Sequence, residues 1–375
     1  MKPYKFLYRL TLASSLSVLA SQLSAQSQPL AFDLDMPSEG SYKLGVFYDN
    51  VNQSTFNFGL EQPNLLGTDD NLALDLSYSK YSSGLSIRST DLDLFESPWS
   101  RTFSFSVRQI STHEDILRDF GFGTADAEVS FGREFGPRRS MSIAFGYNLL
   151  DLKNSDDLPA LIANADVLDD GKVYTGYASL SHKFSTMVGD ENFATSGSTF
   201  ITSLEIGNAG STPYAVGQLS AQRIIPLGER MFTKGRIAAS AGFTNSGDFP
   251  FNQNTSVGGP GSVRGYKPNS LGPVSAMQTS GEDAVVGGKY ALTYSLEVGM
   301  ISGQNRNLAV FAFMDGGDAT NDTSDLAPSR LNRTTGVGLR WQSPVGPFDI
   351  SYAQPVHDRD DERTQELQIT FGWLF

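Results

Sequence analysis

The stretch Lys289-Tyr290-Ala291-Leu292-Thr293-Tyr294-Ser295-Leu296-Glu297-Val298 alternates between two kinds of side chain over its whole length. Every second residue is a tyrosine, leucine or valine, and the positions between carry lysine, alanine, threonine, serine and glutamate. Successive side chains of a β-strand point to opposite faces, so this period of two predicts a strand with one apolar and one polar face. Glu297 lies on the polar face of the predicted strand.

The same alternation recurs along the chain in about sixteen segments. Bacterial outer-membrane barrels have an even number of antiparallel strands. We therefore predict an all-β fold, a transmembrane antiparallel β-barrel of about 16 strands. The alternation is least regular in the tenth segment. The predicted strands span residues 41–49, 54–62, 71–80, 83–92, 101–112, 119–134, 139–149, 173–185, 199–208, 213–225, 231–243, 285–300, 307–317, 335–343, 347–355 and 364–375.

Connections between these segments alternate in length. Those after even-numbered strands are mostly short and turn-like, as at 136–139, 226–229 and 343–346. Several after odd-numbered strands are long, notably 150–172, 244–284 and 318–334. Outer-membrane barrels have short periplasmic turns and longer outer loops. A soluble sandwich has no reason to separate loop lengths in this way.

The N-terminus predicts export. Three basic residues, Lys2, Lys5 and Arg9, precede an apolar run of roughly ten residues, and a small-residue cleavage site ends at Ala25. That run is shorter than the roughly 20 residues of a membrane-spanning helix. We expect a signal peptide at 1–25, a short N-terminal segment at 26–40 and an outer-membrane β-barrel domain at 41–375.

The composition excludes several classes of protein. The absence of cysteine rules out disulfides and thiolate metal sites. A net charge of −13 argues against a nucleic-acid partner. The 37 glycines, 25 phenylalanines and 14 tyrosines, with a mean hydropathy of −0.23, fit an exported barrel whose inward positions are polar. On composition alone, a large soluble periplasmic β-protein is the alternative.

One predicted loop carries a conspicuous charge. It contains Gly258-Gly259-Pro260-Gly261-Ser262-Val263-Arg264-Gly265-Tyr266. An arginine set among glycines, in a chain of alternating strands, suggests a loop that folds inward. Arg264 would then need carboxylate partners in the lumen, and Glu297 and Asp315 are the candidates, since each lies on the inward face of its predicted strand. The alternative places Arg264 at a solvated loop tip.

These residues resemble the barrel of the BamA/TamA/FhaC superfamily of outer-membrane assembly and translocation proteins. The resemblance covers the predicted mature chain and is sharpest from about residue 252 to the end. The motifs that carry it are the tip Val263, Arg264, Gly265 and Tyr266, the strand motif Phe313, Asp315 and Gly317, the stretch 336–347, the terminal strand ending in Phe375, and the N-terminal stretch 57–67.

The resemblance implies a fold and a function. The long sixth outer loop would fold into the lumen, and Arg264 would contact Asp315 and Glu297. The protein would aid insertion or translocation of outer-membrane proteins or lipids through a seam between the first strand, Ser41 to Asp49, and the last, Thr364 to Phe375. The alternative is a translocation-inactive scaffold or a small pore in the outer membrane.

The terminal strand has an apolar face consisting of Leu367, Ile369, Phe371, Trp373 and Phe375. Any last barrel strand must present such residues to lipid. A terminal aromatic strand also resembles the signal by which the outer-membrane assembly machinery recognises the barrels that it inserts. We expect both roles, so that outer-membrane lipids and that machinery are partners of this chain.

About fifteen residues separate the predicted cleavage site from the first strand, too few for a separate folded domain. We therefore expect one domain, a family member lacking POTRA domains. Client recruitment would then depend on the barrel itself or on a periplasmic or lipoprotein partner.

Catalytic and metal-binding patterns are weak. His113, His182 and His357 lie far apart without metal-ligand spacing, and no Gly-x-Ser-x-Gly elbow precedes a helix. An acidic run in the fourth outer loop has the residue type that binds divalent cations, but such runs are more often solvated surfaces. It comprises Asp156, Asp157, Asp166, Asp169 and Asp170. We expect no enzymatic activity, no cofactor and no metal site.

Overall fold

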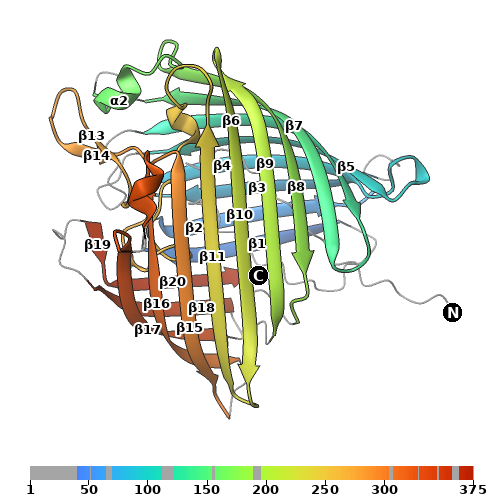
Figure 1. Ribbon diagram of the computed structural model, residues 1–375. Helices are drawn as coiled ribbons and strands as arrows, with labels where there is room; N and C mark the ends of the chain where they lie inside the picture. Colours follow the sequence, from blue (N-terminus) through green and yellow to red (C-terminus); the bar gives the residue numbers. More distant parts are fainter. Residues whose placement is uncertain are drawn as a thin grey trace.

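The computed structural model describes residues 40–50, 52–64, 70–111, 121–153, 157–188, 196–303, 307–327, 329–343, 346–356 and 363–374. Within those ranges, sixteen antiparallel strands close into a barrel, which confirms the predicted fold class (Figure 1). The barrel strands are β1 (Ser41–Asp49), β2 (Gln53–Gln62), β3 (Asp70–Ser79), β4 (Ser82–Asp91), β5 (Trp99–Ile110), β6 (Phe122–Glu134), β7 (Arg139–Leu152), β8 (Lys172–Ser185), β9 (Gly197–Ala209), β10 (Thr212–Leu227), β11 (Met231–Phe243), β15 (Tyr290–Ile301), β16 (Leu308–Thr320), β17 (Asn332–Ser343), β18 (Gly346–Pro355) and β20 (Leu367–Leu374). No helix in the described ranges is long and apolar enough to cross a membrane.

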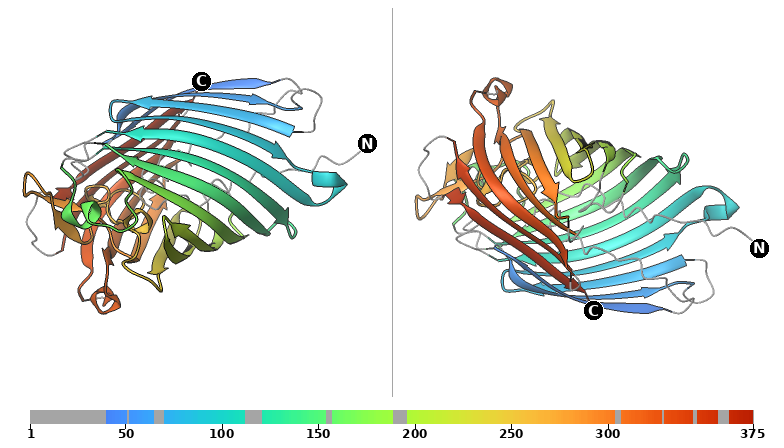
Figure 2. Two further views of the ribbon diagram at one scale, coloured as in Figure 1. Left: turned by 90° about the horizontal axis from the view of Figure 1, so that it is seen from above. Right: turned by 90° about the horizontal axis from the view of Figure 1, so that it is seen from below.

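Alternation along each strand separates the two faces of the barrel wall. On β16, Val310 and Met314 point outward and are 46% and 40% exposed, whereas Phe311, Phe313 and Asp315 point inward and are at most 5% exposed. Directly opposed residues of antiparallel strands share a face, so the same division continues from strand to strand. The strands tilt strongly around the lumen when seen from above and below (Figure 2). The apolar face is the outward one, as in membrane barrels.

The twelfth predicted strand, 285–300, was placed too early. Gly287 has φ +71, which interrupts an extended strand. The residues before it form β14 (Asp283–Val285), which pairs with β13 (Val274–Ala276) in a small hairpin outside the barrel sheet. The barrel strand β15 begins at Tyr290.

The last predicted strand, 364–375, is divided. Its first two residues form β19 (Thr364–Gln365), which pairs with β12 (Gly265–Tyr266) and not with the barrel wall. Barrel strand β20 begins at Leu367, and Phe375 lies outside the described residues. The tenth strand, whose alternation is the least regular, is continuous over the 16 residues of β10.

The loop between β11 and β15, residues 244–289, is called the inward loop because its buried parts, 250–259 and 263–271, lie within the barrel, while residues 278–283 of its β13–β14 hairpin are exposed. It carries η4 (Phe251–Gln253), β12, β13 and β14. Residues 250–259 are all buried although none belongs to a barrel strand. The loop between β7 and β8 packs onto it through α2 (Ala160–Ala163), since Leu158 and Ile162 share a core cluster with Phe251 and Val286. Two further short helices, η2 (Leu94–Glu96) and η5 (Thr323–Leu326), lie in other connections.

Candidate functional site

The tip of the inward loop needs glycine for its path. Gly258, Gly259 and Gly265 have φ values of +118, +88 and +90, a region that residues with a side chain rarely adopt. A Cβ added at Gly265 would lie 3.0 Å from the Cβ of Ala353 and 3.1 Å from a methyl group of Thr334. Gly265 therefore allows the backbone beside Arg264 to approach the inner wall of β17 and β18 closely.

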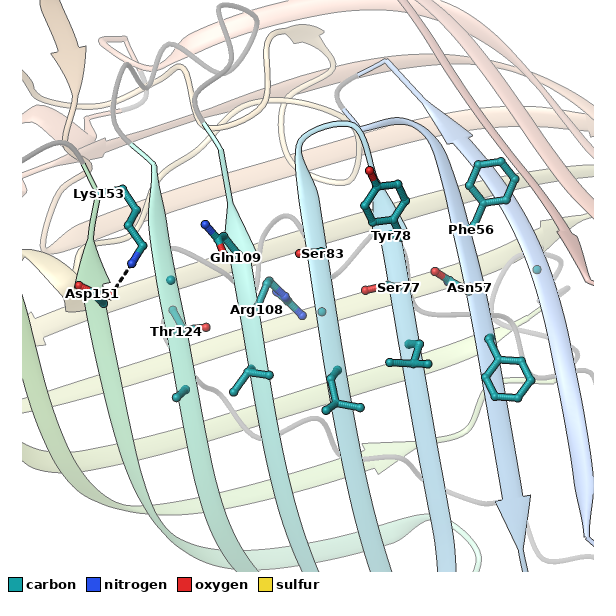
Figure 3. A pocket seen from close by; sticks show the side chains of 18 of the residues that line it. Phe56, Asn57, Ser77, Tyr78, Ser83, Arg108, Gln109, Thr124, Asp151 and Lys153 are labelled. Atoms are coloured by element: carbon teal, nitrogen blue, oxygen red, sulfur yellow. Dashed lines mark hydrogen bonds and ion pairs between the residues drawn. The ribbon is translucent and has the colours of Figure 1, made fainter.

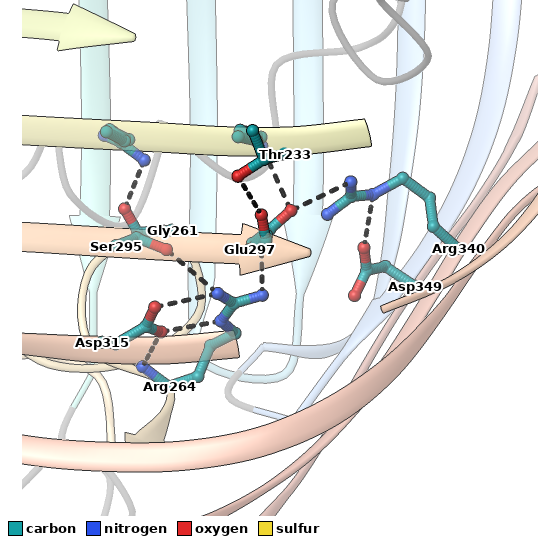
Figure 4. Close-up of polar contacts among 10 residues, drawn as sticks. Thr233, Gly261, Arg264, Ser295, Glu297, Asp315, Arg340 and Asp349 are labelled. Atoms are coloured by element: carbon teal, nitrogen blue, oxygen red, sulfur yellow. Dashed lines mark hydrogen bonds and ion pairs between the residues drawn. The ribbon is translucent and has the colours of Figure 1, made fainter. Parts of the chain in front are cut away.

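Arg264 lies between the two predicted carboxylates (Figure 4). Its Nε donates to Oδ2 of Asp315 at 2.7 Å and its Nη2 to Oδ1 at 2.9 Å, a two-pronged pair. Its Nη1 donates to Oε1 of Glu297 at 2.9 Å, and Nη2 also donates to Oγ of Ser295 at 3.1 Å. The backbone N–H of Arg264 donates to Oδ2 of Asp315 at 3.1 Å, the oxygen that also accepts from Nε. The guanidinium and the backbone of the loop tip are thus both held by β15 and β16.

The three charged groups are withdrawn from solvent. Arg264, Glu297 and Asp315 are 7%, 3% and 1% exposed. Burial by itself would lower the pKa of Arg264, but the hydrogen bonds and negative charge of Asp315, together with Glu297, outweigh it and raise the pKa above its ordinary value. Arg264 therefore stays charged. A buried ion cluster of this kind is sensitive to the loss of any member, because the remaining charge is left unpaired.

A second group of residues surrounds the cluster. Glu297 also faces Nη1 of Arg340 at 3.6 Å and Nζ of Lys234 at 3.9 Å through its Oε2, and Nε of Arg340 donates to Asp349 at 2.9 Å. The ring of Phe313 lies 3.5 Å from the Arg264 guanidinium carbon, a cation–π contact. Sequence reasoning did not identify Ser295, Lys234, Arg340 or Asp349. Their inward parity is visible in the sequence, but their closeness depends on the register of five strands.

The remaining motif residues have packing positions. Val263 and Tyr266 are buried in a small cluster with Val257 and Leu271 of the same loop. Gly317 lies where β15 comes close, since an added Cβ would be 2.6 Å from the carbonyl oxygen of Leu292. These residues therefore shape the loop and its seat on the wall.

The seam between the first and last strands is short. Over the described residues, β1 and β20 form five residue pairs, from Gly45 with Leu374 to Asp49 with Thr370. Beyond the last pair, Asn50 continues the ladder with its side chain. Its Nδ2 donates to the carbonyl of Leu367 at 2.9 Å, and its Oδ1 accepts from the N–H of Ile369 at 2.8 Å. One amide side chain thus bonds to two backbone groups of β20, the carbonyl of Leu367 and the N–H of Ile369. Sequence reasoning did not predict this contact.

The inward loop also holds the start of the last strand. Gly265 and Tyr266, the two residues directly after Arg264, pair with Gln365 and Thr364 of β19. Gln368 donates from Nε2 to the carbonyl of Tyr266 at 2.8 Å. The loop that carries the arginine is therefore bonded to the strand that closes the barrel.

The predicted C-terminal residues lie on or next to β20. Leu367, Ile369 and Phe371 point outward by the strand register, with Leu367 48% exposed. Trp373 is in β20, but its side chain and Phe375 lie outside the described residues. The role of this face as an assembly signal stays a prediction.

The predicted acidic run lies in the loop between β7 and β8. Asp157 accepts a hydrogen bond from the N–H of Thr279 at 2.8 Å, while Asp156 lies outside the described residues. Among the described residues, no three histidine or acidic side chains are placed to hold a metal ion.

A closed sixteen-strand barrel with an apolar outer face and a loop seated on its inner wall defines the class of integral outer-membrane β-barrels. The Omp85 superfamily domain matches residues 64–375, and the chain belongs to this superfamily. It is 27% identical over 168 residues to the outer membrane protein assembly factor BamA of Neisseria meningitidis, and 24% identical over 268 residues to BamA of Nitratidesulfovibrio vulgaris. The matches cover 38% and 70% of this chain, but only 21% and 33% of those two proteins.

Solved structures share the fold. BamA from Haemophilus ducreyi lacking POTRA domains 1–3 superposes with a TM-score of 0.80 at 21% identity, over 90% of this chain and 70% of that one. CdiB from Acinetobacter baumannii superposes with a TM-score of 0.57 at 15% identity, over 90% and 60% of the two chains. The predicted family and the outer-membrane location are confirmed. The matched part of the chain spans about a fifth to a third of the length of these two relatives.

Proposed function

We propose that this barrel aids the insertion or translocation of outer-membrane proteins or lipids by opening the seam between β1 and β20. The observation that carries the proposal is the weak attachment of β20. In the described residues, β20 forms five residue pairs with each neighbour, whereas every other pair of adjacent barrel strands forms eight to thirteen. The last strand is therefore the part of the wall that separates most readily.

The two sides of β20 are held differently, which favours a break on the β1 side. Toward β18 and the lumen, the start of the strand is supported by the β12–β19 pairing and by the bond from Gln368 to Tyr266. Toward β1, the ladder of five pairs is extended by the side chain of Asn50. Separation there would leave β1 and β20 with exposed backbone edges, which can template a strand of another chain.

The Arg264 cluster supports this function from a distance. It joins the inward loop to β15 and β16, on a part of the wall that does not include the seam. With the loop fixed there, β20 stays anchored to the barrel while β1 moves away. The curated relatives are named as assembly factors, and on that analogy a periplasmic or lipoprotein partner would deliver clients to the opened seam.

Disulfide locking tests the seam directly, because the chain has no cysteine of its own. Two variants place cysteine pairs on neighbouring rungs, Phe47→Cys with Gly372→Cys and Tyr48→Cys with Phe371→Cys. Rungs of an antiparallel ladder alternate between wider and closer Cα spacing, and both spacings lie within the range that a disulfide bridges. A control pair, Val310→Cys with Leu339→Cys, locks β16 to β17 instead.

The assay measures how fast an unfolded outer-membrane barrel protein folds into liposomes that contain each variant. We expect oxidation of the seam pairs to abolish the acceleration, reductant to restore it, and the control pair to have no effect. Equal acceleration by the locked and reduced seam variants would contradict the proposal. Conductance in planar bilayers without any effect on folding would support the pore, and neither effect would support the scaffold.

A further inference from the structure

A groove crosses the outside of the barrel wall from β1 to β7. Its two walls are neighbouring rows of residues that are paired across all seven strands. The row nearer the periplasmic side is apolar throughout and includes Leu44, Phe58, Leu76, Leu85, Val107 and Leu149. The row nearer the outer loops changes character, with Val46, Phe56 and Tyr78 on the first three strands and Ser83, Gln109 and Asp151 further along.

The register places this groove on the membrane side. Phe56, Tyr78 and Leu76 are 57%, 67% and 44% exposed and belong to the outward rows. Between the two rows lies a third row, which includes Gly45 and Gly84. Its backbone forms the floor of the groove, and its side chains face the lumen because side chains alternate along each strand. Seven strands spaced by about 4.8 Å make the groove roughly 29 Å long. Its volume is about 950 Å³.

The two ends of the groove differ in chemistry (Figure 3). Toward the β1 end, the aromatic rings of Phe56 on β2 and Tyr78 on β3 project from the wall. At the other end, Lys153 and Asp151 form an ion pair at 2.6 Å, and Gln109 lies two strands away in the same row. This polar end adjoins the connections on the outer side of the barrel. An apolar channel with a polar end matches one molecule with a long hydrocarbon tail and a polar head.

We infer that the groove binds one acyl chain of a single lipid of the outer leaflet. Its head group would lie at Gln109, Asp151 and Lys153, and its tail would run between the two rows toward β1. A smooth barrel wall touches a lipid tail from one side, whereas a groove contacts it from both sides and adds dispersion contacts along its length. The lipid would therefore remain bound longer than its neighbours. This inference is independent of seam opening.

Two substitutions fill the groove without entering the lumen. Gly123 and Ala125 lie on β6. Gly123 belongs to the row nearer the outer loops, and Ala125 belongs to the row nearer the periplasmic side. A Cβ added at Gly123 would have its nearest neighbours at 3.8 and 3.9 Å, so a side chain fits the backbone there. Gly123→Phe and Ala125→Phe each place a ring in the channel. Ala312→Phe adds the same bulk to the outward face of β16, away from the groove, and is the matched control.

The experiment uses the full chain in lipid nanodiscs doped with a phosphatidylethanolamine that carries a diazirine in its acyl chain. After illumination, mass spectrometry maps the labelled residues. We expect the outward residues of β3 to β5 to be labelled severalfold more than Val298, Val310 and Val337 on the opposite wall. Both filling variants should reduce that labelling to the level of the opposite wall, and Ala312→Phe should not.

The heat-modifiable gel shift of each variant checks that its barrel is folded. If either phenylalanine variant does not fold, Gly123→Leu takes its place. Equal labelling of both walls would overturn the inference. Labelling of the groove that persists in both folded filling variants would also overturn it.

Discussion

Gln368 on the last barrel strand donates a hydrogen bond to the backbone carbonyl of Tyr266 at the tip of the inward loop, at 2.8 Å. Gln368 is 2% exposed, so water does not compete for this bond. Tyr266 lies two residues after Arg264, whose guanidinium is fixed to β15 and β16. The arginine cluster and the closing strand are therefore two ends of one connected structure.

Arg264→Ala should strongly destabilise the folded barrel. The substitution leaves Asp315 buried without its two-pronged partner, a loss of about 3–5 kcal/mol for a broken buried pair. Arg264→Lys should cost less, because it keeps the charge but not the planar fork. Urea unfolding in detergent micelles measures the free energy of unfolding. The exposed pair Arg330–Asp325 is the control, and Arg330→Ala should change that free energy by about 0–1 kcal/mol. An equally small change for Arg264→Ala would show that the cluster does not stabilise the barrel.

Asn50→Ala should loosen the outer end of the seam alone. The substitution removes the acceptor of the Ile369 N–H, and a lost bond of about 1 kcal/mol corresponds to roughly fivefold faster amide exchange. Hydrogen exchange of the Ile369 amide, followed by mass spectrometry or NMR, measures it. Asn52→Ala is the control, since Asn52 bonds only to Asp49 in the described contacts of that turn. Unchanged exchange at Ile369 would mean that Asn50 does not close the seam.

Most of the barrel could be predicted from the sequence because its information is local. The bounds of β1 and β11 agree with the predicted segments, since an apolar lipid face and a polar lumen impose alternation within each strand. Two of the misplaced boundaries, the starts of the twelfth and of the last predicted strands, depend on the inward loop. Thr364 and Gln365 alternate like a barrel strand, but their partner is Gly265–Tyr266, about 100 residues earlier. No local pattern records that pairing.

The candidate site divides in the same way. Parity placed Glu297 and Asp315 on inward faces, and the family resemblance supplied their pairing with Arg264. Ser295, Lys234 and Arg340 share that inward parity with many other polar residues. Only the register of the strands brings these three close to the cluster, and the sequence pattern does not give that register. Asn50 is beyond the end of β1 and acts through its side chain, which strand patterns do not describe.

Gly265→Ala should lower the free energy of unfolding by more than the usual substitution of a glycine with positive φ. Gly281 in the β13–β14 hairpin has φ +74 and open space around it, so Gly281→Ala measures the backbone strain alone, about 1–2 kcal/mol. Gly265 has φ +90, and its added methyl group would also press on Ala353 and Thr334. We expect a further loss of about 1–3 kcal/mol in the free energy of unfolding. Equal losses for the two variants would mean that the loop tip is not packed against β17 and β18.

The link between the arginine cluster and the last strand predicts that their substitutions are not additive. Arg264→Lys disturbs the loop tip, and Gln368→Leu removes the bond to Tyr266 while keeping a side chain of similar length. Because both act on the same short loop segment, a double-mutant cycle should give an interaction energy of about 0.5–3 kcal/mol in the free energy of unfolding. The cycle of Arg264→Lys with Arg330→Ala joins residues without a shared partner and should be additive within about 0.3–0.5 kcal/mol. Additivity in both cycles would separate the loop from the seam. The inward loop would then hold its own conformation without anchoring the strand that closes the barrel.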